Sequence, residues 1–335
     1  MQPIYTFSDS DRSTLQQSLL AVAIDPYKDY DRFRDAIAAL IDSGDVPQGF
    51  VDALARIRRE RDEKITYAHL ISNNPVDDEI PWLDQDDALE DKYRKKLTFV
   101  GEGLLELQSQ YLGSPLLAYA TRNNGDFFQD VYADNRFSNT QTQKTDGELY
   151  WHNERTAHPV RADFISLLGL RTPETDLVYT KYVDGREILR FISPENQALL
   201  REAVYITPFD ELSRAQNKNQ IVSDQHALLE NEHSFRYYDT RTVPADPDDL
   251  PHLWALWQFR DALSKVSEQY HRIRDADLLI IANQDGLHSR QLVDVQDRDK
   301  TRFRWLLKTY SFRDAATADR HSDYWLDGVR GRVTD

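Results

Sequence analysis

The feature that most constrains the fold is a change of pattern near residue 115. From there to about residue 312 the chain consists of short β-rich runs separated by turn residues, among them LLAYAT, FISLLGL, LVYTKYV and LLIIAN. One stretch with helical spacing, residues 252–270, interrupts these runs. Many short strands with one long helical insertion predict a closed or sandwiched antiparallel architecture, a double-stranded β-helix or jelly roll.

The first third of the chain has a helical pattern instead. Residues 8–66 contain three segments with apolar positions at helical spacing, and residues 91–112 predict a further helix. Between them, residues 73–87 indicate an ordered loop or an extended crossing, in which Ile80, Trp82 and Leu83 are expected to be buried. We therefore expect an α+β protein of one domain over residues 1–335. Residues 1–112 would form a mainly helical N-terminal layer, and residues 113–335 a jelly-roll core with the helical insertion at 252–270.

Composition excludes several classes of function. The formal net charge is −16, from 41 Lys and Arg against 57 Asp and Glu, which argues against nucleic acid and anionic membranes as partners. No cysteine is present, so thiol nucleophiles and thiolate metal sites are excluded, and any metal must be held by His, Asp or Glu. No apolar run reaches membrane-spanning length. We expect a cytoplasmic protein that acts on a small molecule, and leave its oligomeric state open.

His152 and Glu154, in the segment YWHNER, are the first candidate metal ligands. A His-x-acid pair is a weak signal by itself, because 9 histidines and 57 acids in 335 residues give about 1.5 such pairs by chance. The context strengthens this pair, because residues i and i+2 of an extended segment point to the same face and can reach one ion. A second pair, His321 and Asp323, lies in a polar C-terminal tail and is treated as background.

His288 is the candidate third ligand. It follows the very apolar segment 277–282 and a tight Asn-Gln-Asp-Gly turn. Two histidines and one carboxylate form the facial triad of non-haem Fe(II) oxygenases, which leaves coordination positions open for a cosubstrate and oxygen.

The segment GELYWHNERTAHPVRADFISLLGLR, the distal His288 and the motif RWLLKTY at 304–310 together resemble a known family. It is the clavaminate synthase-like branch of the Fe(II)/2-oxoglutarate oxygenases, and in particular the hydroxylases of free arginine, asparagine and lysine. The resemblance covers roughly residues 70–312. It implies a jelly-roll fold, Fe(II) held by His152, Glu154 and His288, 2-oxoglutarate as cosubstrate, and O2 as oxidant.

The resemblance also implies an arginine that binds the distal carboxylate of 2-oxoglutarate. Arg304 matches the family's Arg-Trp-Leu context, whereas the spacing from His288 favours Arg302. The two residues are expected to share a strand face, so both stay candidates. Thr180, in LVYTKYV, matches the threonine that supports this carboxylate.

For the substrate, the resemblance implies Gln129 and the iron-binding Glu154 at the α-amine and Lys308 at the α-carboxylate, where the family often has arginine. Asp239 would contact the substrate side chain, with Arg241 at the position of a second acid. One acid suits an ammonium group better than a guanidinium, so we expect hydroxylation of L-lysine. L-arginine, L-asparagine or a carrier-bound amino acid are the alternatives. A carboxylate rather than glycine at position 154 implies hydroxylation rather than halogenation.

Two other classes compete with this interpretation. A jelly-roll metalloenzyme independent of 2-oxoglutarate would use similar ligands, but would not need an arginine after the distal histidine. A non-catalytic binding module would not need an intact set of three ligands.

Overall fold

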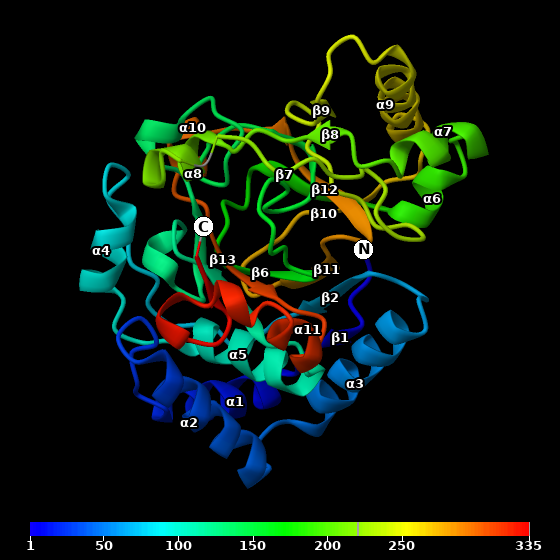
Figure 1. The fold of residues 1–335 in the computed structure, drawn as a ribbon. Coiled ribbons are helices and arrows are strands. Elements are labelled where there is room, and N and C mark those ends of the chain that lie inside the picture. Colours follow the sequence, from blue (N-terminus) through cyan, green and yellow to red (C-terminus); the bar gives the residue numbers. More distant parts are fainter. Residues whose placement is uncertain (220, 335) are drawn as a thin grey trace.

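Two sheets lie face to face in the computed structural model, which describes residues 1–219 and 221–334 (Figure 1). The larger sheet has the order β1-β2-β11-β6-β13-β3-β14, with β4 also paired to β13, and the smaller one β10-β7-β12-β5. A two-stranded unit, β8-β9, lies beside them. The strands are β1 Tyr5–Thr6, β2 Ala68–Ser72, β3 Leu116–Tyr119, β4 Gln129–Tyr132, β5 Leu149–His152, β6 Phe164–Arg171, β7 Leu177–Asp184, β8 Tyr205–Ile206, β9 Val243–Pro244, β10 Gln269–His271, β11 Leu278–Ala282, β12 Gly286–Asp294, β13 Trp305–Ser311 and β14 Arg332–Val333.

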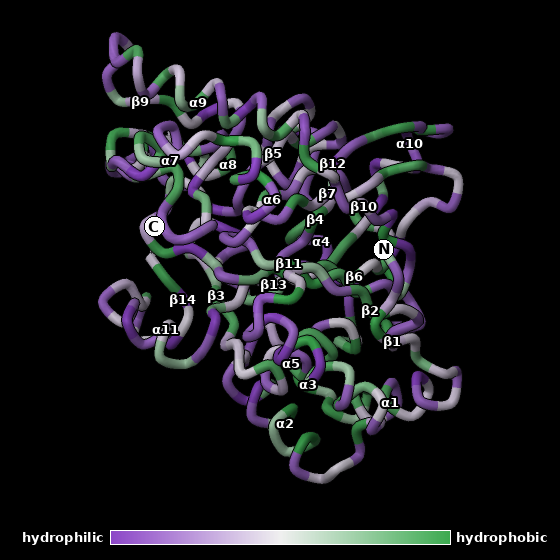
Figure 2. Tube along the Cα trace, turned by 90° about the vertical axis from the view of Figure 1, so that its right-hand side faces the viewer, coloured by the Kyte–Doolittle hydropathy of each residue, from purple (hydrophilic) through white to green (hydrophobic). Residues whose placement is uncertain are grey.

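The N-terminal helices cover the outer face of the larger sheet. Figure 2 shows β6, β11 and β13 between α5 on one side and β7 and β12 on the other. The helices are α1 Asp9–Ala21, α2 Tyr30–Ser43, α3 Gln48–Asp62, α4 Ala88–Lys95, α5 Val100–Leu112, α6 Gly185–Leu189, α7 Pro194–Leu200, α8 Glu211–Gln216, α9 Leu250–Leu263, α10 Arg298–Thr301 and α11 Ala315–Asp319. The three helices predicted over residues 8–66 are thus present. Ser8 caps α1, and Gly44 ends α2 at φ 77°, a backbone conformation that favours glycine.

One apolar core joins the helical layer to the larger sheet. Leu19 and Ile37, from the N-terminal helices, belong to the same cluster of buried side chains as Leu168 and Leu307 from the sheet. Side chains on the opposite face of the sheet, Ile165 of β6 among them, belong to a second buried apolar cluster. Because β6 is covered on both faces, its sequence FISLLGLR is a nearly continuous apolar run rather than an alternating one. β13, WLLKTYS, is also buried along its whole length, but its second half carries polar side chains.

Several boundaries differ from the prediction, each for a tertiary reason. The helix expected at 91–112 is two helices, because the chain turns at Lys96 and places its ammonium group between Asp77 and Glu102. The helical insertion begins at residue 250 and ends at 263, and residues 269–271 pair with β7 instead. Trp82 is 60% exposed rather than buried, with Arg171 stacked 3.9 Å from its ring centroid. The run SFRYYDT forms only isolated β-bridges.

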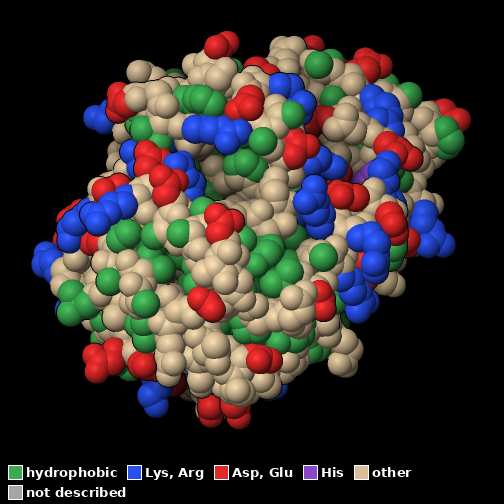
Figure 3. Space-filling view, turned by 90° about the horizontal axis from the view of Figure 1, so that it is seen from below, with side chains coloured by type: hydrophobic (Ala, Val, Ile, Leu, Met, Phe, Trp, Pro, Cys, Tyr) green, Lys and Arg blue, Asp and Glu red, His purple; other side chains and the backbone are tan. Residues whose placement is uncertain are grey.

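The two main sheets are separate hydrogen-bonded units, so the described chain shows a mixed helical and β fold without a closed barrel. Seen from below, the helical face carries charged side chains around apolar ones (Figure 3). In the described part of the chain, no helix has both the length and the hydropathy that crossing a bilayer requires.

Candidate metal centre

His152, Glu154 and His288 converge. His152 ends β5 and is paired in register with His288 on the antiparallel neighbour β12, while Glu154 follows two residues later. One ligand atom from each of the three lies within 4.8 Å of the others. The two imidazole centroids are 4.3 Å apart, and Nε2 of His288 lies 3.7 Å from Oε1 of Glu154. Side chains more than 130 residues apart in the sequence therefore meet at one point.

The protonation state of His152 suits metal binding. Its Nδ1 lies 2.7 Å from the carbonyl oxygen of Tyr150, which can only accept, so Nδ1 carries the hydrogen and the lone pair is on Nε2. Burial, assisted by the neighbouring His288, lowers the pKa of His152 to about 3, so the ring is neutral at pH 7. Two imidazoles and one carboxylate are a donor set that Fe(II) takes in non-haem oxygenases. The residues present fit that ion.

Two residues of β13 hold the carboxylate of Glu154. Lys308 Nζ donates to Oε1 at 2.8 Å, and the Tyr310 hydroxyl donates to Oε2 at 3.0 Å. Gln143 accepts a further hydrogen bond from the Lys308 ammonium. Burial opposes ionisation of Glu154, but the Lys308 charge and the hydrogen bond with His288 outweigh it and hold the pKa well below its usual range. The carboxylate is therefore charged and fixed in orientation.

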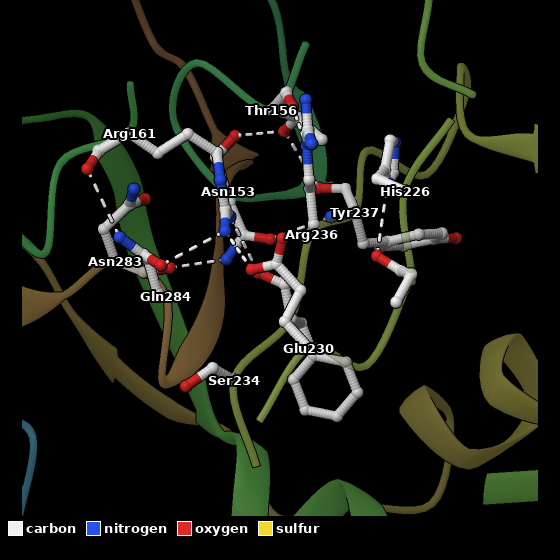
Figure 4. Close-up of polar contacts among 12 residues, drawn as sticks. Asn153, Thr156, Arg161, His226, Glu230, Ser234, Arg236, Tyr237, Asn283 and Gln284 are labelled. Atoms are coloured by element: carbon white, nitrogen blue, oxygen red, sulfur yellow. Dashed lines mark hydrogen bonds and ion pairs between the residues drawn. The ribbon is translucent and has the colours of Figure 1, made fainter. Parts of the chain in front are cut away.

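Asn153, between the first two ligands, points into a buried polar network (Figure 4). Its amide nitrogen donates to the carbonyl oxygens of Asn283 and Gly286, the latter at 2.8 Å, and its amide oxygen accepts from Tyr237 N at 2.9 Å. The side chain of Asn283 accepts in turn from the backbone N–H of Glu154 at 2.7 Å. This network ties the segment that carries the first two ligands to the turn that precedes the third.

Arg304 is buried immediately before β13, and among the described residues its guanidinium has no hydrogen-bond partner. Burial, followed by the like charge of Arg290, lowers the pKa of Arg304 to about 9. Burial also lowers the pKa of Arg290 to about 10, although Asp146 opposes this. Both arginines line one small cavity, which also includes Val178 and Leu292. A buried guanidinium without a partner is costly, so this cavity is suited to an anion.

The structure separates the two arginine candidates for the cosubstrate. The prediction that Arg302 and Arg304 share a strand face is wrong, because Arg302 is the C-terminal cap of α10 and β13 begins only at Trp305. Its guanidinium is bound to Asp146 and to Asn135. Thr180 is buried on β7, directly opposite Arg290 in the register of β12.

Gln129 and Lys308 are cross-strand neighbours, so both side chains project from the same face of the sheet. Gln129 is fully buried, and its Nε2 donates to the carbonyl oxygen of Asp126. Its Oε1 is buried and accepts no hydrogen bond from the described residues. An acceptor is thus available beside the Lys308–Glu154 pair.

Asp239 is not placed as the sequence predicted. It does not line the cavity beside the metal ligands, and it is bound to the Tyr237 hydroxyl and lies 3.5 Å from Arg260. The acid that does line this cavity, apart from Glu154, is Asp210. Arg241 is not an isolated cation either, because it forms an ion pair with Glu211 at 2.6 Å.

Sequence reasoning missed Arg290, Tyr310 and Asn153. The first two could have been found by the same i, i+2 argument that joined His152 to Glu154, since Arg290 stands two residues after His288 and Tyr310 two after Lys308. Asn153 carried no signal, because its partners are backbone atoms of distant segments.

The fold is similar to that of non-haem iron oxygenases of solved structure. The solved structure of an asparagine oxygenase with Fe(II), 2S,3S-3-hydroxyasparagine and succinate matches it with a TM-score of 0.80 over 99% of both chains, at 19% identity. The non-haem iron oxygenase OrfP with Fe and α-ketoglutaric acid matches with a TM-score of 0.74 over 97% of this chain and 98% of that one, at 22% identity.

Among curated proteins, the L-lysine 3-hydroxylase of Catenulispora acidiphila is 23% identical over 186 residues. The match covers 53% of this chain and spans half the length of that relative. No family model matches the sequence. The resemblance to iron-dependent amino acid oxygenases that the sequence predicts is confirmed by these relatives.

Proposed function

We propose that this protein is an Fe(II)- and 2-oxoglutarate-dependent oxygenase that hydroxylates an unactivated C–H bond of a free L-amino acid, with L-lysine as the substrate. The observation that carries the proposal is the convergence of His152, Glu154 and His288, within 4.8 Å of one another. The fold shared with an asparagine oxygenase and with OrfP supports it.

The three side chains would hold the iron, and Arg304 would bind the distal carboxylate of 2-oxoglutarate. When bound, iron and cosubstrate supply with O2 the oxidising power that C–H hydroxylation requires. The Arg304 guanidinium, buried and without a partner among the described residues, is the feature that a 2-oxoglutarate-independent metalloenzyme would not need. Arg302 is committed to Asp146, which favours Arg304 for this role, with Thr180 on the strand beside the same cavity.

The Lys308–Glu154 ion pair fits an α-amino acid. A zwitterion carries one negative and one positive group, so its carboxylate can take the Lys308 ammonium while its own ammonium takes Glu154 and the free Oε1 of Gln129. Each buried charge keeps an opposite partner in this exchange, which avoids the penalty of an unpaired buried ion.

For the substrate side chain, we propose that Asp210 replaces Asp239 as the acid that meets the lysine ammonium, since Asp210 lines the cavity. The printed activity of the Catenulispora relative supports lysine. One observation favours a neutral side chain such as that of asparagine instead. Asp210 already pairs with Arg122 at 2.6 Å, and Glu211 pairs with Arg241.

We also propose that the two facing sheets form a jelly-roll core, and that residues 1–335 fold as one domain. The buried cluster that joins α1 and α2 to β6 and β13 supports a single folding unit.

Anaerobic titration with Fe(II) and 2-oxoglutarate tests the activity class. The protein should give a visible metal-to-ligand charge-transfer band, and the variant His288→Ala should lose it. A wild-type protein without the band would refute the class. Succinate release measured over a panel of free amino acids then tests the substrate. Turnover with asparagine or arginine and none with lysine would refute the lysine assignment.

A further inference from the structure

Arg290 is a second cation in the cavity that Arg304 enters. It stands two residues after His288 on β12, so both side chains project from the same face of that strand. Its Nε and Nη2 donate to the carbonyl oxygens of Thr145 and Gly147 at 2.6 to 2.9 Å. These bonds fix the plane of the guanidinium, and they leave Nη1 without a hydrogen bond to any described residue.

The cavity holds more positive than negative charge. Of the described residues that line it, Arg290 and Arg304 are cationic and Asp146 is the one acid. Asp146 is itself bound to Arg302. Two like charges that are withdrawn from water, and whose one neighbouring acid is already bound to another arginine, repel each other, and an anion that contacts both lowers that penalty.

We propose that Arg290 and Arg304 together bind the distal carboxylate of the cosubstrate, so that the site selects a 2-oxo dicarboxylate over a 2-oxo monocarboxylate. The inference rests on the proposed function. Two residues of β-strand span about 7 Å, which suits a five-carbon diacid that chelates the metal beside His288 and extends toward Arg290. The buried Thr180 lies opposite Arg290 in the strand register and places a hydroxyl on the same face.

The test compares 2-oxoglutarate with 2-oxobutyrate, which has the same chelating keto acid and no distal carboxylate. Dissociation constants for both are measured anaerobically on the Fe(II)-loaded protein from the charge-transfer band. Wild type should prefer 2-oxoglutarate strongly. Arg290→Met should reduce this preference by about tenfold to a hundredfold, the range for hydrogen bonds to charged groups, and should leave 2-oxobutyrate binding unchanged.

The matched control is Arg171→Met, which removes a guanidinium that also donates to backbone carbonyl oxygens, those of Ile80 and Pro81, and does not line the cavity. Its preference should equal that of wild type, and thermal unfolding of each variant verifies folding. Arg304→Met gives a second measurement that leaves Arg290 intact. It should retain part of the preference, because the remaining guanidinium still recognises the distal carboxylate.

Two results would overturn the inference while the proposed function stands. One is a charge-transfer band in Arg290→Met with an unchanged preference. The other is equal affinity for the two keto acids in Arg304→Met, which would make Arg304 the sole anchor. A wild-type protein that gives no band with either keto acid would overturn the proposed function and this inference together.

Discussion

Replacement of Asn153 by alanine should weaken both the fold and the metal site. The change removes two hydrogen bonds that the side chain donates to the carbonyl oxygens of Asn283 and Gly286, and one that it accepts from Tyr237 N. These three hydrogen bonds lie in the interior, and the Asn153 side chain is fully buried. A buried polar group left without a partner costs about 1–3 kcal/mol, and partial relaxation or entry of water reduces the sum. We expect a loss of about 3–5 kcal/mol in the free energy of unfolding.

The effect on the metal follows from the position of this residue. Without its side chain, the segment that carries His152 and Glu154 loses its ties to the turn before His288. Loss of groups that orient metal ligands typically lowers metal affinity about tenfold to a hundredfold. Urea unfolding of the metal-free protein measures the first effect, and anaerobic titration with Fe(II) measures the second.

Asn74→Ala is the matched control. Asn74 is also fully buried, and its amide nitrogen donates to the carbonyl oxygens of Ile71 and Ala276, both at 2.8 Å, away from the metal ligands. It should lower stability to a similar extent and leave metal affinity unchanged. Equal metal affinities for Asn153→Ala and Asn74→Ala would refute the idea that Asn153 positions the ligands.

Three further predictions follow from contacts elsewhere in the molecule. Lys96→Met should lower the free energy of unfolding, measured in urea, by about 3–5 kcal/mol, because it leaves the carboxylates of Asp77 and Glu102 buried without their cation. A loss below about 1 kcal/mol would contradict this and show that water replaces the ammonium group. Burial lowers the pKa of His226 to about 4, so as the pH falls the unfolded chain binds a proton at this residue before the folded chain does. The neutral His226 should therefore contribute about 3 kcal/mol to the free energy of unfolding above pH 6.5, and this contribution should be lost between pH 6.5 and 4. Unfolding curves of His226→Gln should depend less on pH than those of wild type over this interval, and parallel curves would contradict the assignment. Removal of Fe(II) with a chelator should abolish turnover and lower the thermal midpoint, and re-addition should restore both; a midpoint that does not respond to Fe(II) would contradict binding to the folded state.

The metal ligands were the part of the site most accessible to sequence reasoning. His152 and Glu154 are neighbours by strand alternation, so local geometry alone puts them on one face. His288 was a candidate from its position after an apolar strand and a tight turn, and the family resemblance supported joining it to the pair, since no local rule pairs β5 with β12. The same holds for Gln129 and Lys308, whose cross-strand pairing appears only in the register of β4 and β13.

Asp239 shows where such reasoning fails. The motif around it matched the family by position, but the side chain turns to Tyr237 and Arg260. An acid on a segment without regular strand pairing has no alternation to fix its direction, so neighbouring side chains decide which way it points. The cavity-lining acid, Asp210, instead lies at the start of α8, which it caps.

By itself the sequence determined the helical first third and the β-rich remainder, because periodicity is a property of neighbouring residues. It also limited any metal ligands to His, Asp and Glu, because the chain has no cysteine. The tertiary structure decided which arginine is left without a partner, which acid faces the cavity and where α4 gives way to α5. These outcomes depend on how buried charges from distant segments pair with one another. Such pairing becomes defined only when burial removes the water that would otherwise solvate each charge separately.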